Sequence, residues 1–168
     1  MKMKRFFILS LMALMTISST ADTLTIRQPF IEMPDSLIPY LSHNSRLDFL
    51  DFMDSKMKAE IINEFGGKSM MITLGEDSLT IRMNDACTLE LLLLTTTELV
   101  DGCNHVISMI KTVGVDDGYQ ESTVQYFTIH WKPLSDIPKL IPEHRKRLDS
   151  YVKPLRILNF FDRKLNNN

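Results

Sequence analysis

The chain has 168 residues, of which 44% are hydrophobic and 24% charged, a balance typical of a globular protein rather than a disordered or fibrous one. The formal net charge is −2, but residues 22–138 hold eight basic and eighteen acidic residues, a net charge of −10. Residues 139–168 hold eight basic and three acidic residues, a net charge of +5. Because the large acidic part would repel phosphates, nucleic acid is not expected as a partner.

The first 21 residues have the pattern of a secretory signal peptide. Three basic residues within the first five positions precede an apolar run from Phe6 to Ile17, and Ser19 and Ala21 precede a break at Asp22. This run is shorter than the roughly 20 residues that span a bilayer, and no longer one follows. We therefore expect an exported protein with no transmembrane segment in its mature chain. The leader contains no cysteine that could accept a lipid, so a lipoprotein is not expected.

The remaining 147 residues are enough for one domain with a single apolar core. We place this domain at residues 22–138 and treat residues 139–168 as a basic amphipathic C-terminal extension. Large apolar side chains alternate with the charges of this extension, which indicates a docked helix or wrap rather than a free basic arm.

The N-terminal part of the domain is predicted to be mainly helical. Residues 23–30 alternate and predict an edge strand or an extended arm. Asp35 is a candidate N-cap for a short helix that ends at Leu41. Apolar residues at helical spacing from Leu47 to Phe65 predict a longer helix, which a pair of glycines ends.

After the glycine pair the apolar spacing becomes alternating, which predicts β-strands. Short polar turns separate the first three strands, while a longer loop at 95–102 and a turn at 115–120 precede the last two. Strands joined by such turns pair with their neighbours in the chain, so a five-stranded antiparallel meander is expected. The predicted strands cover residues 70–74, 79–83, 89–93, 105–113 and 122–131.

The predicted fold class is α+β, with the N-terminal helices packed on one face of the five-stranded meander and a basic C-terminal tail. The apolar stripe of the helices and the apolar face of the sheet cover each other in this arrangement, and the opposite face is expected to be more polar. The expected pairs in the first hairpin are Leu74 with Leu79, Ile72 with Ile81 and Met70 with Met83. Side chains expected to join the covered face are Val106, Ile110, Phe127, Ile129 and Trp131.

The two cysteines are predicted to be separate thiols. Cys87 precedes the third strand and Cys103 follows it, which places them about 20 Å apart at 3.3 Å per residue. A disulfide requires Cα atoms within about 7 Å.

Two histidines and two aromatic residues are the candidate site residues. His105 and His130 would lie opposite each other if the last hairpin were symmetric about Asp117 and Gly118, close enough to share a metal or a proton. Two ligands are too few for a zinc site, so no metal, cofactor or catalytic residue is assigned. Tyr126 and Trp131 are candidates for an aromatic binding surface, with core packing as the alternative for Trp131.

Several segments resemble a known protein family. The run Met33–Leu41, the segment Asn44–Phe49 and the pair Gly66–Gly67 are similar to a domain-of-unknown-function family of small exported proteins from Bacteroidales, and Lys111–Val113 also fits. The resemblance implies a Gram-negative periplasmic or envelope setting and assigns no activity.

The functional hypothesis is a non-enzymatic binding or scaffold module for an envelope component. Its partner would be an envelope protein, a peptide or a glycan, bound through the outer sheet face or the basic tail. The absence of any recognised catalytic spacing favours this class over an enzyme. The alternative is a metal-dependent or hydrolytic enzyme that uses His105 and His130.

Overall fold

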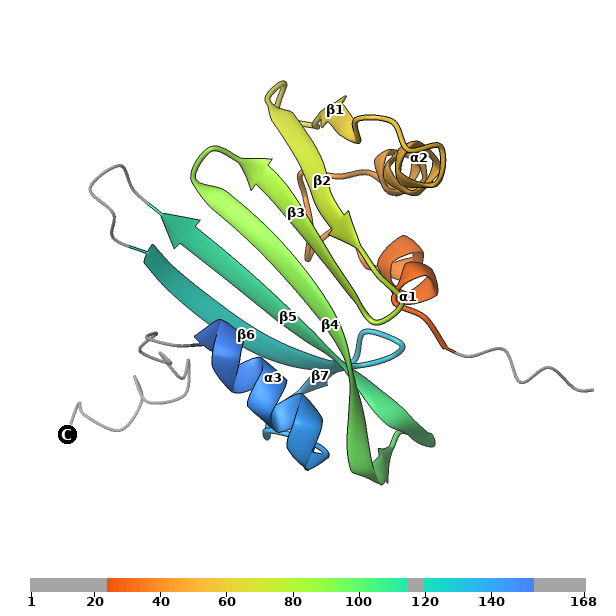
Figure 1. The fold of residues 1–168 in the computed structure, drawn as a ribbon, viewed down its shortest axis with the longest axis vertical. Coiled ribbons are helices and arrows are strands. Elements are labelled where there is room, and N and C mark those ends of the chain that lie inside the picture. Colours follow the sequence, from red (N-terminus) through yellow and green to blue (C-terminus); the bar gives the residue numbers. More distant parts are fainter. Residues whose placement is uncertain (1–23, 115–119, 153–168) are drawn as a thin grey trace, which may run out of the picture.

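The computed structural model describes residues 24–114 and 120–152, with side chains up to Asp149. The predicted signal peptide, the turn at 115–119 and the end of the tail lie outside these residues. Figure 1 shows a twisted antiparallel sheet with helices packed against it. Within the described ranges, no helix has the length and apolar character needed to cross a membrane.

The sheet is a meander of seven strands in sequence order. The predicted α+β class and antiparallel meander are therefore confirmed, but two short edge strands, β1 and β7, were not predicted. The strands are β1 (Glu60–Ile62), β2 (Lys68–Leu74), β3 (Ser78–Asn84), β4 (Cys87–Val100), β5 (Cys103–Gly114), β6 (Gln120–Thr128) and β7 (Pro133–Leu134). The helices are α1 (Arg27–Glu32), α2 (His43–Asp54) and α3 (Pro142–Val152).

The first described element is the helix α1, not the predicted edge strand or arm. Ile26, Phe30 and Met33 are spaced as one face of a helix, and all three are fully buried against the sheet. Pro29 is tolerated because it lies in the first turn, where its missing N–H would have no helical acceptor. Burial of this face outweighed the local alternation that suggested a strand.

The region from 35 to 65 contains one helix where two were predicted. Residues 35–41 form successive turns, with Leu41 N–H donating to the carbonyl of Ile38. Helix α2 is capped by Ser42, whose hydroxyl accepts from the N–H of Ser45. It ends at Asp54, shortly before Lys56 adopts a positive φ of 55°, so the predicted continuation to residue 65 is wrong.

The first predicted hairpin is correct at its turn and wrong further along. Leu74 pairs with Leu79 as expected, but a register shift in β2 makes Met71, not Ile72, the partner of Ile81. Such a bulge inserts one extra residue and reverses the faces beyond it. Met71 is accordingly 3% exposed, whereas Ile72 is 41% exposed.

The longest hairpin joins β4 to β5 and replaces the predicted loop at 95–102. Strand β4 continues to Val100, and the turn is made by Asp101 and Gly102, both with positive φ. Cys103 pairs with Val100 at this end, and Cys87 lies at the far end of β4. The two thiols are free, as predicted.

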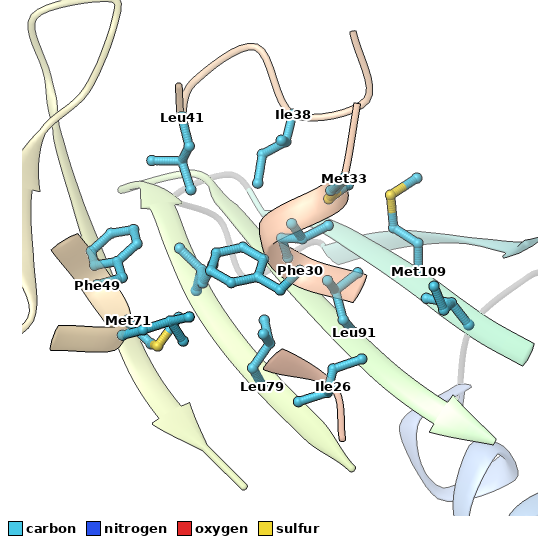
Figure 2. Packing of buried hydrophobic residues seen from close by; sticks show 14 of the residues in the cluster. Ile26, Phe30, Met33, Ile38, Leu41, Phe49, Met71, Leu79, Leu91 and Met109 are labelled. Atoms are coloured by element: carbon cyan, nitrogen blue, oxygen red, sulfur yellow. The ribbon is translucent and has the colours of Figure 1, made fainter. Parts of the chain in front are cut away.

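Both faces of the sheet carry an apolar cluster. The first lies beneath α1 and α2, where Figure 2 shows Phe30, Phe49, Leu79 and Leu91 packed together. Phe127 and Trp131 belong to this cluster, and Ile129 packs partly against it, in agreement with prediction. The second cluster contains Leu92, Leu94, Val106, Ile110, Leu140 and Leu148.

The second cluster corrects two expectations about the sheet. Val106 and Ile110 were placed on the face covered by the N-terminal helices, but they lie beneath α3 on the other face. Figure 1 shows α3 lying against β5 and β6, away from α1 and α2. The start of the C-terminal extension therefore covers part of the sheet face that was expected to be polar, through Leu140 and Leu148.

A buried arginine joins α1, the turn region and α2. Arg46 on α2 is 2% exposed. Its guanidinium donates to the carbonyls of Ile31 and Leu41 at 2.9–3.3 Å and to the carboxylate of Asp35 at 2.8 Å. Because a buried carbonyl without a donor is costly, this single side chain fixes both ends of the segment between the two helices.

We predict that Arg46→Met lowers the free energy of unfolding by about 2–4 kcal/mol, because the carbonyls of Ile31 and Leu41 would lose their donors. The loss can be measured by urea unfolding, followed by the fluorescence of Trp131, the single tryptophan of the chain. The matched control is Arg27→Met, which removes an exposed ion pair with Asp54 and should cost much less. An equal loss in both variants would contradict the role given to Arg46.

Candidate functional site

The structure does not bring His105 and His130 together as a cross-strand pair. Val106 pairs with Thr128, whereas the predicted register paired Val106 with Ile129. Strand β6 ends at Thr128, and His130 lies in the turn that follows. A shift of one residue was enough to remove the predicted pair.

The two candidate aromatic residues lie in packed surroundings. Trp131 is 6% exposed, its ring centroid lies 5.3 Å from that of Phe127 in a tilted arrangement, and its Nε1 donates to the carbonyl of Pro29 at 2.8 Å. Trp131 therefore connects α1 to the end of the sheet through this hydrogen bond. Its burial agrees with the alternative that Trp131 is a core residue. Tyr126 packs against the second cluster beneath α3, where burial raises the pKa of its hydroxyl.

His105 has neighbours that were not predicted. Its Nδ1 lies 3.9 Å from the sulfur of Cys103, and its strand partner Thr95 donates its N–H to Nδ1 of His144 on α3 at 2.6 Å. Burial, together with the nearby charge of His144, holds the pKa of His105 below its ordinary value. Across the part of the chain that the structure describes, no group of three His, Cys, Asp or Glu residues could hold a metal.

A partly buried carboxylate also lies on the α3 face of the sheet. Glu90 pairs in register with Thr80 on β3 and Ile110 on β5, and its Oε2 is buried without a hydrogen-bond partner. The hydroxyl of Ser108 on the same face is likewise unpartnered. Burial raises the pKa of Glu90, because the charged form is poorly solvated there.

One candidate site is a partly open cavity of about 340 Å³ at the Cys87 end of β4. Three separate parts of the chain form its walls: the turn region before α2, the β3–β4 turn, and the end of β5. The lining residues are Leu37, Ile38, Pro39, Tyr40, Met83, Asn84, Ala86, Cys87, Leu89, Lys111 and Val113.

The cavity combines apolar walls with few polar groups. Asn84 donates from its amide to the hydroxyl of Tyr40 at 3.0 Å and accepts from the N–H of Ala86 at 2.9 Å. Lys111 supplies a positive charge. Burial raises the pKa of the Cys87 thiol, and the charge of Lys111 partly opposes this rise. A thiol with a raised pKa is mostly protonated at neutral pH, so Cys87 is not activated as a nucleophile.

Sequence reasoning missed this site because its residues share no motif. Tyr40, Cys87 and Lys111 are far apart in the chain and meet only through the fold. The one usable signal was the resemblance, whose segments include Tyr40 and Lys111.

The comparisons place the chain in a family. The family described as "Protein of unknown function (DUF3256)" matches residues 16–160. The chain belongs to the DUF3256 family. This agrees with the resemblance to a family of unknown function. No curated protein matches the DUF3256 chain.

A solved structure is similar to the DUF3256 chain in fold. It is described as the structure of a domain of an uncharacterized protein from Porphyromonas gingivalis W83. The TM-score is 0.52 and the sequence identity 20%, over 65% of this chain and 52% of that one. The DUF3256 chain thus spans about half the length of that chain, and the likeness supports the fold alone.

We predict that mild acid lowers the stability of the folded protein through His105, whose pKa is affected by the charge of His144 on α3. Because the folded protein lowers the pKa of His105, the unfolded chain binds this proton more readily, and the free energy of unfolding falls as the pH drops below about 6.5. Urea unfolding at pH 7 and pH 5 should show this fall. His105→Gln should reduce it, whereas His43→Gln, on the exposed start of α2, should leave it unchanged. Identical pH dependence in His105→Gln and the wild type would refute the prediction.

We also predict that Glu90→Gln raises the free energy of unfolding at pH 7. Because the pKa of Glu90 is higher in the folded protein than in the unfolded chain, folding disfavours the charged carboxylate. This cost to the free energy of unfolding is fully present at pH values above the folded-state pKa, and it disappears as the pH falls below the unfolded-state pKa. The gain should therefore shrink toward pH 4. Glu64→Gln, at an exposed glutamate, is the control and should show no gain.

Proposed function

We propose that this DUF3256 protein is an exported, non-enzymatic binding module of the cell envelope, and that the cavity beside Tyr40 receives the apolar part of its ligand. The observation that carries the proposal is the cavity itself. Its volume of about 340 Å³, its mainly apolar walls and its few polar groups are features of small-ligand sites. The signal-peptide pattern supports the export and the periplasmic setting.

Hydrogen bonds across the cavity support binding by a preformed site. The Tyr40–Asn84 bond joins the turn region to the end of β3. The N–H of Gly114 donates to the carbonyl of Ala86 at 2.8 Å, which joins the β3–β4 turn to the end of β5. Walls fixed in this way lose little conformational freedom when a ligand enters.

The cavity is preferred to the surfaces considered from the sequence. The outer sheet face is partly covered by α3 through Leu140 and Leu148, which reduces the area open to a partner there. The enzyme alternative required His105 and His130 side by side, and the register of β5 and β6 does not provide that pair. An envelope protein, a peptide or a glycan could each present an apolar group to the cavity.

We predict that an apolar probe protects Cys87 from alkylation. Cys87 lines the cavity, and Cys103 at the opposite end of the β4–β5 hairpin serves as an internal control. 1-Decanol at about ten times its dissociation constant leaves about one cavity in ten empty, so it should slow the reaction of N-ethylmaleimide with Cys87 by about tenfold and leave the rate at Cys103 unchanged. The rates can be followed by mass spectrometry of the labelled peptides.

Two variants at the exposed Ala86 test whether the cavity is the site. Ala86→Trp should block the cavity and abolish the protection, whereas Ala86→Ser keeps a small side chain and should preserve it. If neither decanol nor the blocking tryptophan altered the Cys87 rate relative to Cys103, the proposed function would be rejected.

A further inference from the structure

We propose that the ligand of this cavity is an unbranched acyl chain that ends in a carboxylate, with Lys111 binding the carboxylate. This inference rests on the proposed function and names the chemical class of the ligand. It follows from three properties of the site: a charge with no acidic partner among the described residues, the amide of Asn84 and the peptide groups of Ala86 that are already hydrogen-bonded, and a limited volume.

Lys111 carries a charge that no acidic side chain of the described residues neutralises. It lies on β5 in register with Leu89 of β4, and both side chains line the cavity. Four other lysines form ion pairs of 2.6–3.2 Å with carboxylates: Lys58 and Lys68 with Glu60, Lys132 with Asp101, and Lys139 with Glu98. Lys111 is half-buried and has no such pair among residues 24–114 and 120–149.

A lysine beside apolar walls, with no acidic side chain paired to it among the described residues, favours an anionic ligand. Removing a charge from water is costly unless an opposite charge or a hydrogen bond compensates it. Lys111 lines the cavity together with Cys87. A ligand carboxylate at this point would form a charge-assisted hydrogen bond that the free protein lacks.

The polar groups of the walls favour a hydrocarbon chain over a peptide. The amide of Asn84 bonds both Tyr40 and Ala86, and the N–H and carbonyl of Ala86 are both occupied. A bound peptide would bring amide groups that need partners, and these walls have few left to offer. A methylene chain needs none and would pack against Leu37, Ile38, Met83, Leu89 and Val113.

The volume limits the size of the ligand. At about 340 Å³ the cavity is near the lower end of the roughly 300–1,000 Å³ range of ligand sites. This is room for one hydrocarbon chain of medium length, whereas a lipid with two long chains would leave much of its apolar surface outside the cavity. Sodium decanoate is therefore a suitable probe, and 1-decanol is its uncharged counterpart.

The test compares decanoate with 1-decanol, using Cys87 protection on the full mature chain as the readout. Decanoate should bind at least about tenfold more tightly than 1-decanol, as expected for a hydrogen bond to a charged group. Lys111→Met should remove this preference while leaving 1-decanol binding intact, and Lys111→Arg should keep it. The control is Lys139→Met, at a lysine paired with Glu98 near the other end of the hairpin, which should behave as the wild type.

The outcomes separate this inference from the proposed function. Equal binding of decanoate and 1-decanol, or an unchanged preference in Lys111→Met, would overturn the acyl-carboxylate assignment while the apolar cavity remains a binding site. Protection of Cys87 by a short peptide with an apolar C-terminal residue, at concentrations where decanoate has no effect, would overturn it in favour of a peptide ligand. Loss of protection by every probe would reject both proposals.

Discussion

Burial of β4 and β5 on both faces is the constraint on which the rest of the structure depends. Residues Leu91 to Leu94 are consecutive and all buried, so alternate side chains enter different clusters on the two faces of the sheet. A sheet whose central strands are apolar on both sides needs cover on both sides. Helices α1 and α2 cover one face and α3 covers part of the other, which makes the first part of the C-terminal extension a component of the core.

The sequence predicted the meander well because turns and alternation are local signals. It predicted the second face badly, because the strand predicted at residues 89–93 was given one apolar side, although the continuous apolar run from Leu91 to Leu94 is typical of strands buried on both sides. The bulge at Ile72 could not be predicted either, because a bulge depends on how β2 pairs with β3 and not only on the residues of β2. Helix α1 formed because tertiary burial of Ile26 and Phe30 outweighed a weak local pattern.

The candidate site was harder to predict than the fold because it is assembled from distant segments. Tyr40, Cys87 and Lys111 become neighbours only through two hairpins and the turn region before α2, and no spacing in the chain reveals that arrangement. The predicted pair of histidines depended on the exact strand register, which the sequence does not determine. His105 and His130 were matched by assuming a symmetric turn, and a difference of one residue moved His130 past the end of β6.

The buried Arg46 links the stability of the fold to the shape of the cavity. The turn region that supplies Leu37 and Tyr40 has no regular secondary structure, and a segment of this kind would normally be the most mobile wall of a site. Arg46 holds the carbonyls of Ile31 and Leu41 at its two ends, and Tyr40 is held again by Asn84. Because these bonds form during folding, the entropy of ordering this wall is lost before any ligand arrives, and more of the contact energy remains for binding.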